Sequence, residues 1–363
     1  MKRLFTLVIV AIMLLTLLFT GCKAVTTATT SAQAETTVAT TSAQAETTVA
    51  KKIPKIAFIF VSMEAEFWVA SHKFITESLK SKGVEVIERN AQEDATKQLE
   101  MIKDAIAQKV DAVILIPQDG EEAVTAGKLC NEAGIPIGVY ARPPSNKDAK
   151  YVVVLSDNYD IAVKSMTDMD KTAQKKFQET GEKITPLIVL GDLGDPNAIE
   201  RKNGFYDVIN QNKDIYNTPI EIPGKWDAAT CSANLTTAFQ ANPNIDFIFA
   251  PSDVYLAPTQ AVLTNAGKWF KWDDPKHIIL GSIDGGSFAG KLIDEGYLDA
   301  EGIHDLDAQA KIMIDAIMKA IETGDKTPEA WVQTPSFALT QYNNAERRME
   351  MWGNILRKEK GEI

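Results

Sequence analysis

Aromatic and charged side chains occur in this sequence in a pattern that would suit a ring-shaped ligand bearing hydroxyl groups. The aromatic residues are the adjacent pair Phe67–Trp68 and Trp226, which lies in the segment GKWDAAT. Two charged residues follow apolar runs: Arg142 precedes two prolines, and Asp284 precedes two glycines. Aromatic rings suit the flat C–H face of a sugar, and a guanidinium or carboxylate group can make two hydrogen bonds to hydroxyls at its rim. These residue types predict a site that binds a small ligand by ring stacking and hydrogen bonds.

The sequence lacks the common arrangements for catalysis and metal binding. His72, His277 and His304 are its three histidines, and their spacing is not that of metal ligands. There is no CxxC, HExxH, P-loop or Gly-x-Ser-x-Gly motif, and the segment GDLG at 191–194 lacks the third glycine of a dinucleotide-binding loop. We therefore predict that the protein is not an enzyme and has no metal or other cofactor.

The segments that must position these side chains alternate between strand-like and helix-like patterns. Apolar runs of strand length occur at 55–62, 84–90, 111–117, 135–141, 151–157, 185–192, 245–253 and 277–284. Between them, apolar residues recur three and four positions apart, and Gly83 and Gly134 stand where two of the helices would end. Apolar strands joined by helices indicate a parallel sheet covered on both faces. Because the pattern restarts near residue 185, we predict two α/β lobes of five or six strands each.

Polar and aromatic residues concentrate directly after the predicted strands. In open α/β sheets, ligands bind at the carboxyl ends of the strands. We therefore expect a binding edge formed by 62–68, 117–119, 141–142, 192–197, 252–253, 284–286 and His304.

Short motifs along the chain support a specific resemblance. In order they are Phe67–Trp68, LIPQDGEEAV, GIPIGVYAR, SDNYDIAV, NAIERKNGF, FIFAPSD, ILGSIDGG and EGIHDLD. With these motifs, residues 55 to about 342 resemble the periplasmic sugar-binding proteins of the ribose, galactose and arabinose type, which are type 1 periplasmic binding proteins. The resemblance implies two doubly wound parallel-sheet lobes joined by a hinge of three segments.

The resemblance also implies where the lobes begin and end. The three crossings are expected near 155–156, 303–305 and 334–336. The N-lobe would then comprise 53–155 and 306–333, and the C-lobe 156–305 and 334–363. EGIHDLD is expected to be a strand that leaves the C-lobe, with His304 at a crossing and facing the cleft.

Ten ligand-binding residues follow from the resemblance and from the binding edge. They are Phe67, Trp68, Asp119, Arg142, Asn197, Trp226, Ser252, Asp253, Asp284 and His304. Several have a structural alternative: Phe67 as a core residue, Arg142 in a salt bridge, and Asp253 or Asn197 as a helix cap. His304 could bond a ligand, and titrate near pH 6, or bond only to hinge backbone. Arg201 is left out, because in the family this arginine usually braces the lobe.

Four positions depart from the ribose-binding pattern. Ala141 replaces an aspartate, Ile199 a ligand arginine, Ser252 an asparagine and His304 a glutamine. Each unmatched hydroxyl lowers affinity. We therefore expect a pyranose, a short oligosaccharide or a polyol rather than ribose.

The N-terminus reads as a bacterial lipoprotein signal. Lys2 and Arg3 precede the apolar stretch 4–19, and Gly21–Cys22 closes the motif LFTGC. We predict a signal peptide at 1–21 and lipid attachment at Cys22; an ordinary secretory signal or an anchor helix is the alternative. Residues 22–52 form a Thr- and Ala-rich spacer in which TTSAQAETTVA occurs twice in tandem. This composition predicts disorder.

The net charge limits the classes of binding partner, and the cysteine content bears on disulfide formation. Without Lys2 and Arg3, 36 basic and 49 acidic residues remain, a balance that disfavours nucleic acid and anionic lipid. Cys130 and Cys231 fall in predicted helices of different lobes and are read as small buried residues rather than a disulfide.

We expect a monomeric, extracytoplasmic binding protein that serves an ABC importer, or alternatively a membrane-bound receptor kinase or chemoreceptor.

Overall fold

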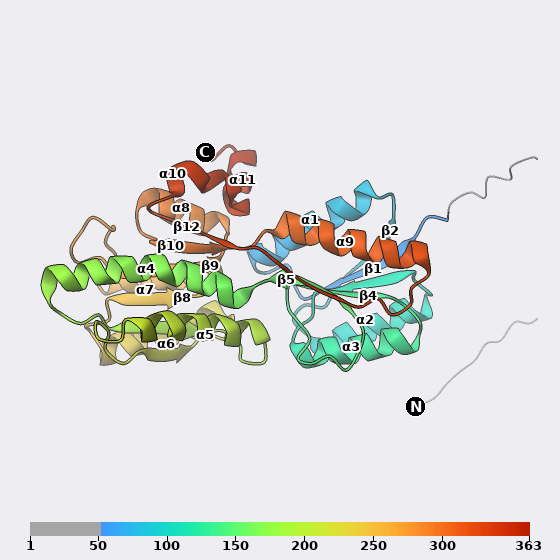
Figure 1. The fold of residues 1–363 in the computed structure, drawn as a ribbon, viewed down its shortest axis with the longest axis horizontal. Helices are drawn as coiled ribbons and strands as arrows, with labels where there is room; N and C mark the ends of the chain where they lie inside the picture. Colours follow the sequence, from blue (N-terminus) through green and yellow to red (C-terminus); the bar gives the residue numbers. More distant parts are fainter. Residues whose placement is uncertain (1–51) are drawn as a thin grey trace, which may run out of the picture. The chain divides into compact units, whose positions relative to one another are not determined.

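The computed structural model describes residues 52–363 (Figure 1). The predicted signal peptide, Cys22 and nearly all of the spacer lie outside the described residues. Among residues 52–363, no helix is sufficiently long and apolar to cross a membrane.

The first sheet is parallel and has a helical layer on each face. Its strands, in spatial order, are β11 (Ala330–Thr334), β5 (Val152–Ser156), β4 (Ile137–Tyr140), β3 (Ala112–Leu115), β1 (Lys55–Phe60) and β2 (Glu85–Asn90). Alternate residues of β1 point to opposite faces. Ile56 and Phe58 pack with α1 (Glu66–Ser81) and α9 (Leu306–Thr323), whereas Ala57 and Ile59 pack with α2 (Ala95–Ala107) and α3 (Gly120–Glu132). Residues buried on both faces explain the continuous apolar runs in the sequence.

The second sheet repeats this architecture. Its order is β12 (Phe337–Thr340), β10 (Ala300–Ile303), β9 (Ile279–Asp284), β8 (Phe247–Ala250), β6 (Pro186–Leu190) and β7 (Ile220–Pro223), with β12 antiparallel to β10. One face is covered by α4 (Asn158–Thr180) and α5 (Pro196–Gln211). The other face is covered by α6 (Ala228–Ala241), α7 (Leu256–Asn265) and α8 (Ser287–Glu295). A short 3-10 turn, Asp253–Tyr255, precedes α7, and the chain ends in α10 (Asn344–Arg347), the 3-10 turn Arg348–Glu350 and α11 (Trp352–Glu359). The prediction of two parallel-sheet α/β lobes is confirmed.

The structure adds strands that the sequence patterns did not reveal. β7, β11 and β12 are four or five residues long, and β7 and β11 are partly exposed edge strands without a continuous apolar run. The strand expected over EGIHDLD ends at Ile303, because α9 begins at Leu306 with Asp305 as its N-cap. Gly83 and Gly134 follow their helices with φ of +67°, a conformation that glycine adopts without steric cost.

The chain passes between the two sheets three times, and buried side chains connect the three passages. The passages lie between Ser156 and Asn158, between Ile303 and Leu306, and between Thr334 and Phe337. Gln309 Nε2 lies 2.8 Å from Ser156 Oγ and 3.1 Å from Thr334 Oγ1. His304 Nδ1 lies 2.8 Å from the same Ser156 Oγ. One hydrogen-bond network therefore includes all three segments of the hinge.

Cys130 and Cys231 are free thiols buried in different lobes. Burial raises the pKa of both to about 12, so neither is present as a reactive thiolate near neutral pH.

A buried histidine in the C-lobe should make stability depend on pH. His277 Nε2 lies 2.7 Å from Asp299 Oδ2, and Nδ1 lies 2.7 Å from the carbonyl oxygen of Phe270. Burial opposes the charged imidazole, but the carboxylate and carbonyl outweigh it and raise the pKa of His277. A raised folded-state pKa contributes stability that is fully present below the unfolded pKa of about 6.5 and is lost as pH rises through the folded value.

We therefore expect His277→Gln to lower the free energy of unfolding more at about pH 6 than at about pH 9. Urea unfolding of the parent and the variant at both pH values measures this difference. An equal loss at both values would mean that the His277 charge contributes nothing.

Candidate ligand-binding cleft

A cleft of about 870 Å³ lies where the carboxyl ends of the strands of both sheets meet. Such a volume is typical of small-molecule sites. Nine of the ten predicted ligand residues line it: Phe67, Trp68, Asp119, Arg142, Asn197, Trp226, Ser252, Asp284 and His304. The binding edge expected from the strand pattern therefore coincides with the main cavity of the described residues.

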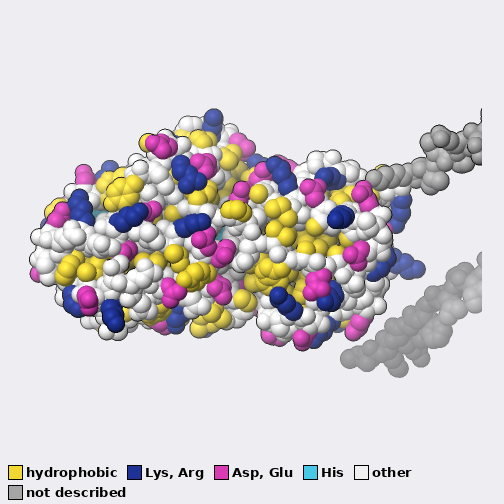
Figure 2. Space-filling model, viewed as in Figure 1, with side chains coloured by type: hydrophobic (Ala, Val, Ile, Leu, Met, Phe, Trp, Pro, Cys, Tyr) yellow, Lys and Arg dark blue, Asp and Glu magenta, His cyan; other side chains and the backbone are white. Residues whose placement is uncertain are grey.

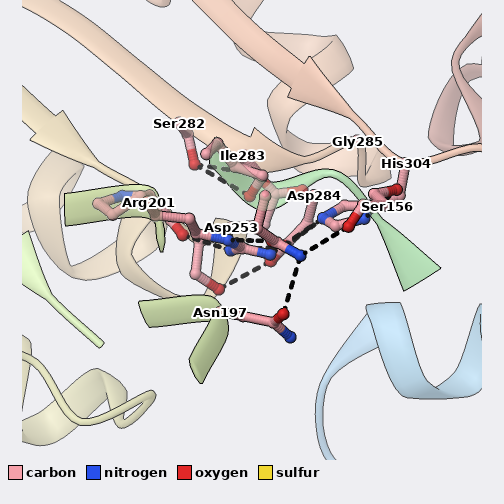
Figure 3. Close-up of polar contacts among 12 residues, drawn as sticks. Ser156, Asn197, Arg201, Asp253, Ser282, Ile283, Asp284, Gly285 and His304 are labelled. Atoms are coloured by element: carbon pink, nitrogen blue, oxygen red, sulfur yellow. Dashed lines mark hydrogen bonds and ion pairs between the residues drawn. The ribbon is translucent and has the colours of Figure 1, made fainter. Parts of the chain in front are cut away.

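At the inner end of the cleft, Arg201 is bonded to several groups at once (Figure 3). Its Nη1 lies 3.2 Å from Asp284 Oδ1 and 2.6 Å from the carbonyl oxygen of Pro251. Its Nη2 lies 3.0 Å from His304 Nε2, and its Nε donates to Asn158 Oδ1 at 2.8 Å. Arg201, Asp284 and His304 are each less than one-tenth exposed. This buried cluster is a rigid set of polar groups beside the hinge.

Asp284 is an ionised carboxylate in this cluster. Its Oδ2 accepts hydrogen bonds from Ser252 Oγ at 2.7 Å and from the Asp253 N–H at 3.1 Å. Burial opposes ionisation, but the charge of Arg201 and the hydrogen bond from Ser252 favour the carboxylate, and the pKa of Asp284 is lowered. An ionised, well-oriented carboxylate can accept hydrogen bonds from ligand hydroxyls.

His304 lines the cleft, but both of its ring nitrogens have protein partners. Nε2 faces the Arg201 guanidinium, which can only donate, so Nε2 is the acceptor and Nδ1–H donates to Ser156 Oγ. Burial and the neighbouring Arg201 lower the pKa of His304 despite the attraction of Asp284. These contacts favour a neutral imidazole that links Arg201 to the hinge, and titration of His304 near pH 6 at a ligand stays a prediction.

Arg142 makes the salt bridge that the sequence left as an alternative to ligand binding. Its Nε donates to Asp195 Oδ2 at 2.8 Å across the lobe boundary, and Nη1 donates to the carbonyl oxygens of Pro117, at 2.9 Å, and Gln118. Among residues 52–363, the Nη2 group of Arg142 makes no hydrogen bond. Arg142 therefore braces the cleft and keeps the two N–H donors of Nη2 for a ligand.

The three predicted aromatic residues lie in the cleft from both lobes. Phe67 and Trp68 of α1 pack edge to face, with ring centroids 4.8 Å apart, and Arg142 lies 5.3 Å from the Trp68 ring. From the C-lobe, Trp226 is stacked on Tyr255 and lies 5.3 Å from the guanidinium of Arg201.

A glycine and an unusual backbone conformation allow Trp226 to enter the cleft. Its φ is +57°, and its N–H donates to Tyr255 Oη at 2.7 Å. The indole packs directly over Gly191, where a Cβ would come within 2.2 Å of the ring. Its Nε1 is buried without a partner among the described residues, which leaves a hydrogen-bond donor for a ligand.

Asp119 and Asn197 line the cleft but also have structural roles. Asp119 caps α3 by accepting from the Glu122 N–H at 2.7 Å. Asn197 donates to the carbonyl oxygen of Ala141 in the other lobe at 2.9 Å and accepts from Asn158 at 2.9 Å. Both of its polar atoms are thus used by the protein, and it joins the lobes.

The structure places Asp253 away from the cleft lining and places Arg201, which was left out of the site in the sequence-based prediction, among the lining residues. Asp253 is not among the residues lining the cleft: its Oδ2 accepts from the Gly286 N–H at the start of α8, and Oδ1 from Ser282 Oγ. Burial and the charge of Asp284 raise its pKa. Arg201 was expected to brace the lobe, and its bonds to Asn158 and to the carbonyl oxygen of Pro251 agree with that; it also lies at the centre of the inner cluster. Its position four residues after Asn197, on the same face of α5, was the signal that could have identified it.

Comparison with known proteins agrees with this geometry. Residues 56–326 match the family model described as the periplasmic binding protein domain. The D-apiose import binding protein of Actinobacillus succinogenes is 24% identical over 275 residues, which cover 76% of this chain and 84% of that protein. A putative rhizopine-binding protein of Rhizobium meliloti is 27% identical over 269 residues, covering 73% of this chain and 82% of that protein.

Solved structures show the same fold. A solute-binding protein from Bacillus halodurans with bound myo-inositol superimposes with a TM-score of 0.69 at 24% identity, covering 82% of this chain and 98% of that one. A solute-binding protein from Actinobacillus succinogenes with bound D-allose superimposes with a TM-score of 0.70 at 21% identity, covering 80% and 99%.

The two parallel-sheet lobes with a cleft between them are the architecture of a type 1 periplasmic binding protein. The matching relatives are binding proteins and not enzymes. The chain belongs to the periplasmic binding protein domain family. Membership of this family implies a location outside the cytoplasm.

Proposed function

We propose that the protein captures an uncharged, polyhydroxylated small molecule, a sugar or a cyclic polyol, between its lobes and delivers it to an ABC importer. The observation that carries this proposal is the buried Arg201–Asp284–His304 cluster, which faces a cleft bearing Trp68 from one lobe and Trp226 from the other. Fixed polar groups beside aromatic rings match the hydroxyl rim and the C–H face of such ligands. Relatives are named as import binding proteins for D-apiose and ribose, which supports the role in import.

The charges around the cleft favour a ligand without negative charge. Its acidic lining residues are Glu64, Glu93, Asp119, Glu121, Asp192, Asp195, Asp227 and Asp284. Three cationic residues, Arg142, Arg201 and Lys225, line it. Two of these are already paired, Arg142 with Asp195 and Arg201 with Asp284. A sugar acid or sugar phosphate would therefore meet a repulsive field.

The charge distribution on the outer surface gives no indication of a nucleic-acid partner. On the face shown in Figure 2, acidic and basic side chains are interspersed and do not form a basic patch of the kind that binds nucleic acid.

A ligand screen tests the proposal. We expect calorimetry to detect binding of at least one neutral compound from D-allose, D-fucose, D-arabinose, myo-inositol and short oligosaccharides, and no binding of the corresponding uronic acids or phosphates. Because such a ligand bridges two lobes, saturation should also favour a closed state and lower the radius of gyration in small-angle scattering. Binding only of anionic compounds, or of none, would contradict the proposal.

We also propose that the mature chain is tethered to the membrane by lipid on Cys22, on the strength of the LFTGC motif. Cys22→Ser should abolish lipid labelling in cells and release the protein from the membrane fraction. Equal labelling of parent and variant would contradict lipidation at this residue.

A further inference from the structure

The C-terminal segment 341–363, which includes α10 and α11, lies beyond the part of the chain that matches the family model. It covers the start of α8 (Figure 1), where it buries Met351, Trp352, Asn354 and Arg357. It also reaches the N-lobe: the Trp352 ring lies 6.5 Å from that of Phe67, and Lys73 Nζ lies 2.9 Å from Glu359 Oε2. The segment therefore contacts both lobes.

Trp352 is bonded to the backbone of the residue that carries the cleft carboxylate. Its indole Nε1–H donates to the carbonyl oxygen of Asp284 at 2.8 Å, while the backbone N–H of His304 reaches the same oxygen only at 3.4 Å. Trp352 is 4% exposed, so water cannot readily replace this donor. The indole thus provides the short hydrogen bond to this carbonyl group.

The turn that receives this bond has an uncommon backbone conformation. Asp284 has a φ of +139° and Gly285 a φ of +99°. The C-terminal segment holds the turn at a second point, because the Gly353 N–H donates to the carbonyl oxygen of Gly285 at 2.9 Å. Gly353 itself lies so close that a Cβ on it would come within 2.2 Å of the Gly286 carbonyl carbon. A non-glycine residue such as Asp284 keeps this conformation only when its surroundings enforce it.

We propose that Trp352 is a positioning residue of the ligand site: through its indole N–H, it holds the Asp284 peptide so that the carboxylate points to Arg201 and to the cleft. The expected effect of Trp352 on ligand affinity rests on the proposed function, whereas its effect on the position of Asp284 does not. It assigns a role in binding to a segment outside the family match. Trp352 acts through Asp284 and is not among the residues that line the cleft.

Trp352→Phe tests this role, because phenylalanine retains an aromatic ring but has no N–H donor; the phenyl ring is also smaller than the indole. We expect its affinity for myo-inositol or D-allose, whichever the parent binds more tightly, to fall roughly tenfold, the scale of one buried hydrogen bond. Two controls show whether a disturbance of the same segment, or a tryptophan replacement elsewhere, is enough to change binding, and the position of Asp284 in the variant separates positioning from packing. Lys73→Gln breaks the contact of the same segment with α1 without touching Asp284, and Trp331→Phe replaces an exposed tryptophan on β11. Both should bind within about twofold of the parent.

A second measurement does not depend on the ligand. In the crystal structure of unliganded Trp352→Phe, the Asp284 carboxylate should have turned away from Arg201, with the fold otherwise retained. An unchanged Asp284 together with unchanged affinity would overturn the positioning role. If the parent binds no compound of the screen, the proposed function fails, while the position of Asp284 in the variant still decides the inference about Trp352.

Discussion

Arg201→Ala should lower the affinity for the ligand at least a hundredfold, the largest effect that we expect from a single substitution in the cleft. The variant loses the donors to Asp284, His304 and the carbonyl oxygen of Pro251 together. It also leaves the Asp284 carboxylate buried without its countercharge. Removing one partner of a buried ion pair costs about 3–5 kcal/mol, far more than an exposed pair contributes. Titration calorimetry with the best compound of the screen measures the loss.

Matched variants distinguish the site from general stability. Arg348→Ala removes an arginine that is ion-paired with Asp294 in the same lobe, outside the residues that line the cleft, and should bind as the parent does. Arg201→Lys retains the charge but not the planar fork and should recover only part of the affinity. A folded Arg201→Ala protein with the affinity of the parent would remove this residue from the site.

His304→Ala should weaken binding by about 1–3 kcal/mol, the cost of leaving a buried donor of Arg201 without its acceptor. The structure changes the reason for this expectation, since the imidazole bonds Arg201 and Ser156 and so joins the cleft cluster to the hinge network. We therefore expect His304→Ala also to diminish the ligand-induced change in radius of gyration. His304→Gln should recover part of both effects, because an amide also offers one acceptor and a donor group.

The pH profile separates this role from direct titration at the ligand. Burial lowers the pKa of His304, so the imidazole gains its proton at a lower pH than an ordinary histidine, and the affinity of the parent should change little between about pH 7 and 8. A decrease of affinity toward pH 6 in the parent that disappears in His304→Gln would show that the imidazole does change charge at the site. Calorimetry at three pH values decides between these outcomes.

Much of the architecture follows from local patterns in the sequence. The strands β1, β3 and β4 are buried on both faces, so their apolar runs could hardly be anything other than central strands of a covered sheet. The cleft followed from the same patterns, because polar residues placed directly after such strands must meet at one edge. Strands β7 and β11 were missed because short strands with few buried residues carry too weak a pattern to be distinguished from loops. β12 is mostly buried, but its four residues are too few to show a period.

The sequence by itself therefore determined the fold class, the location of the cleft and the residue types that line it, since these depend on periodicity and on residues close in the chain. Only the tertiary structure decided the pairing within the cleft. Asp284 and His304 are brought to Arg201 from strand ends that lie 83 and 103 positions away in the chain. Trp352 reaches Asp284 from a C-terminal segment with no recognisable motif. Partners so distant in sequence leave no local signature, because the contact that selects them exists only after both lobes and the C-terminal helix have packed.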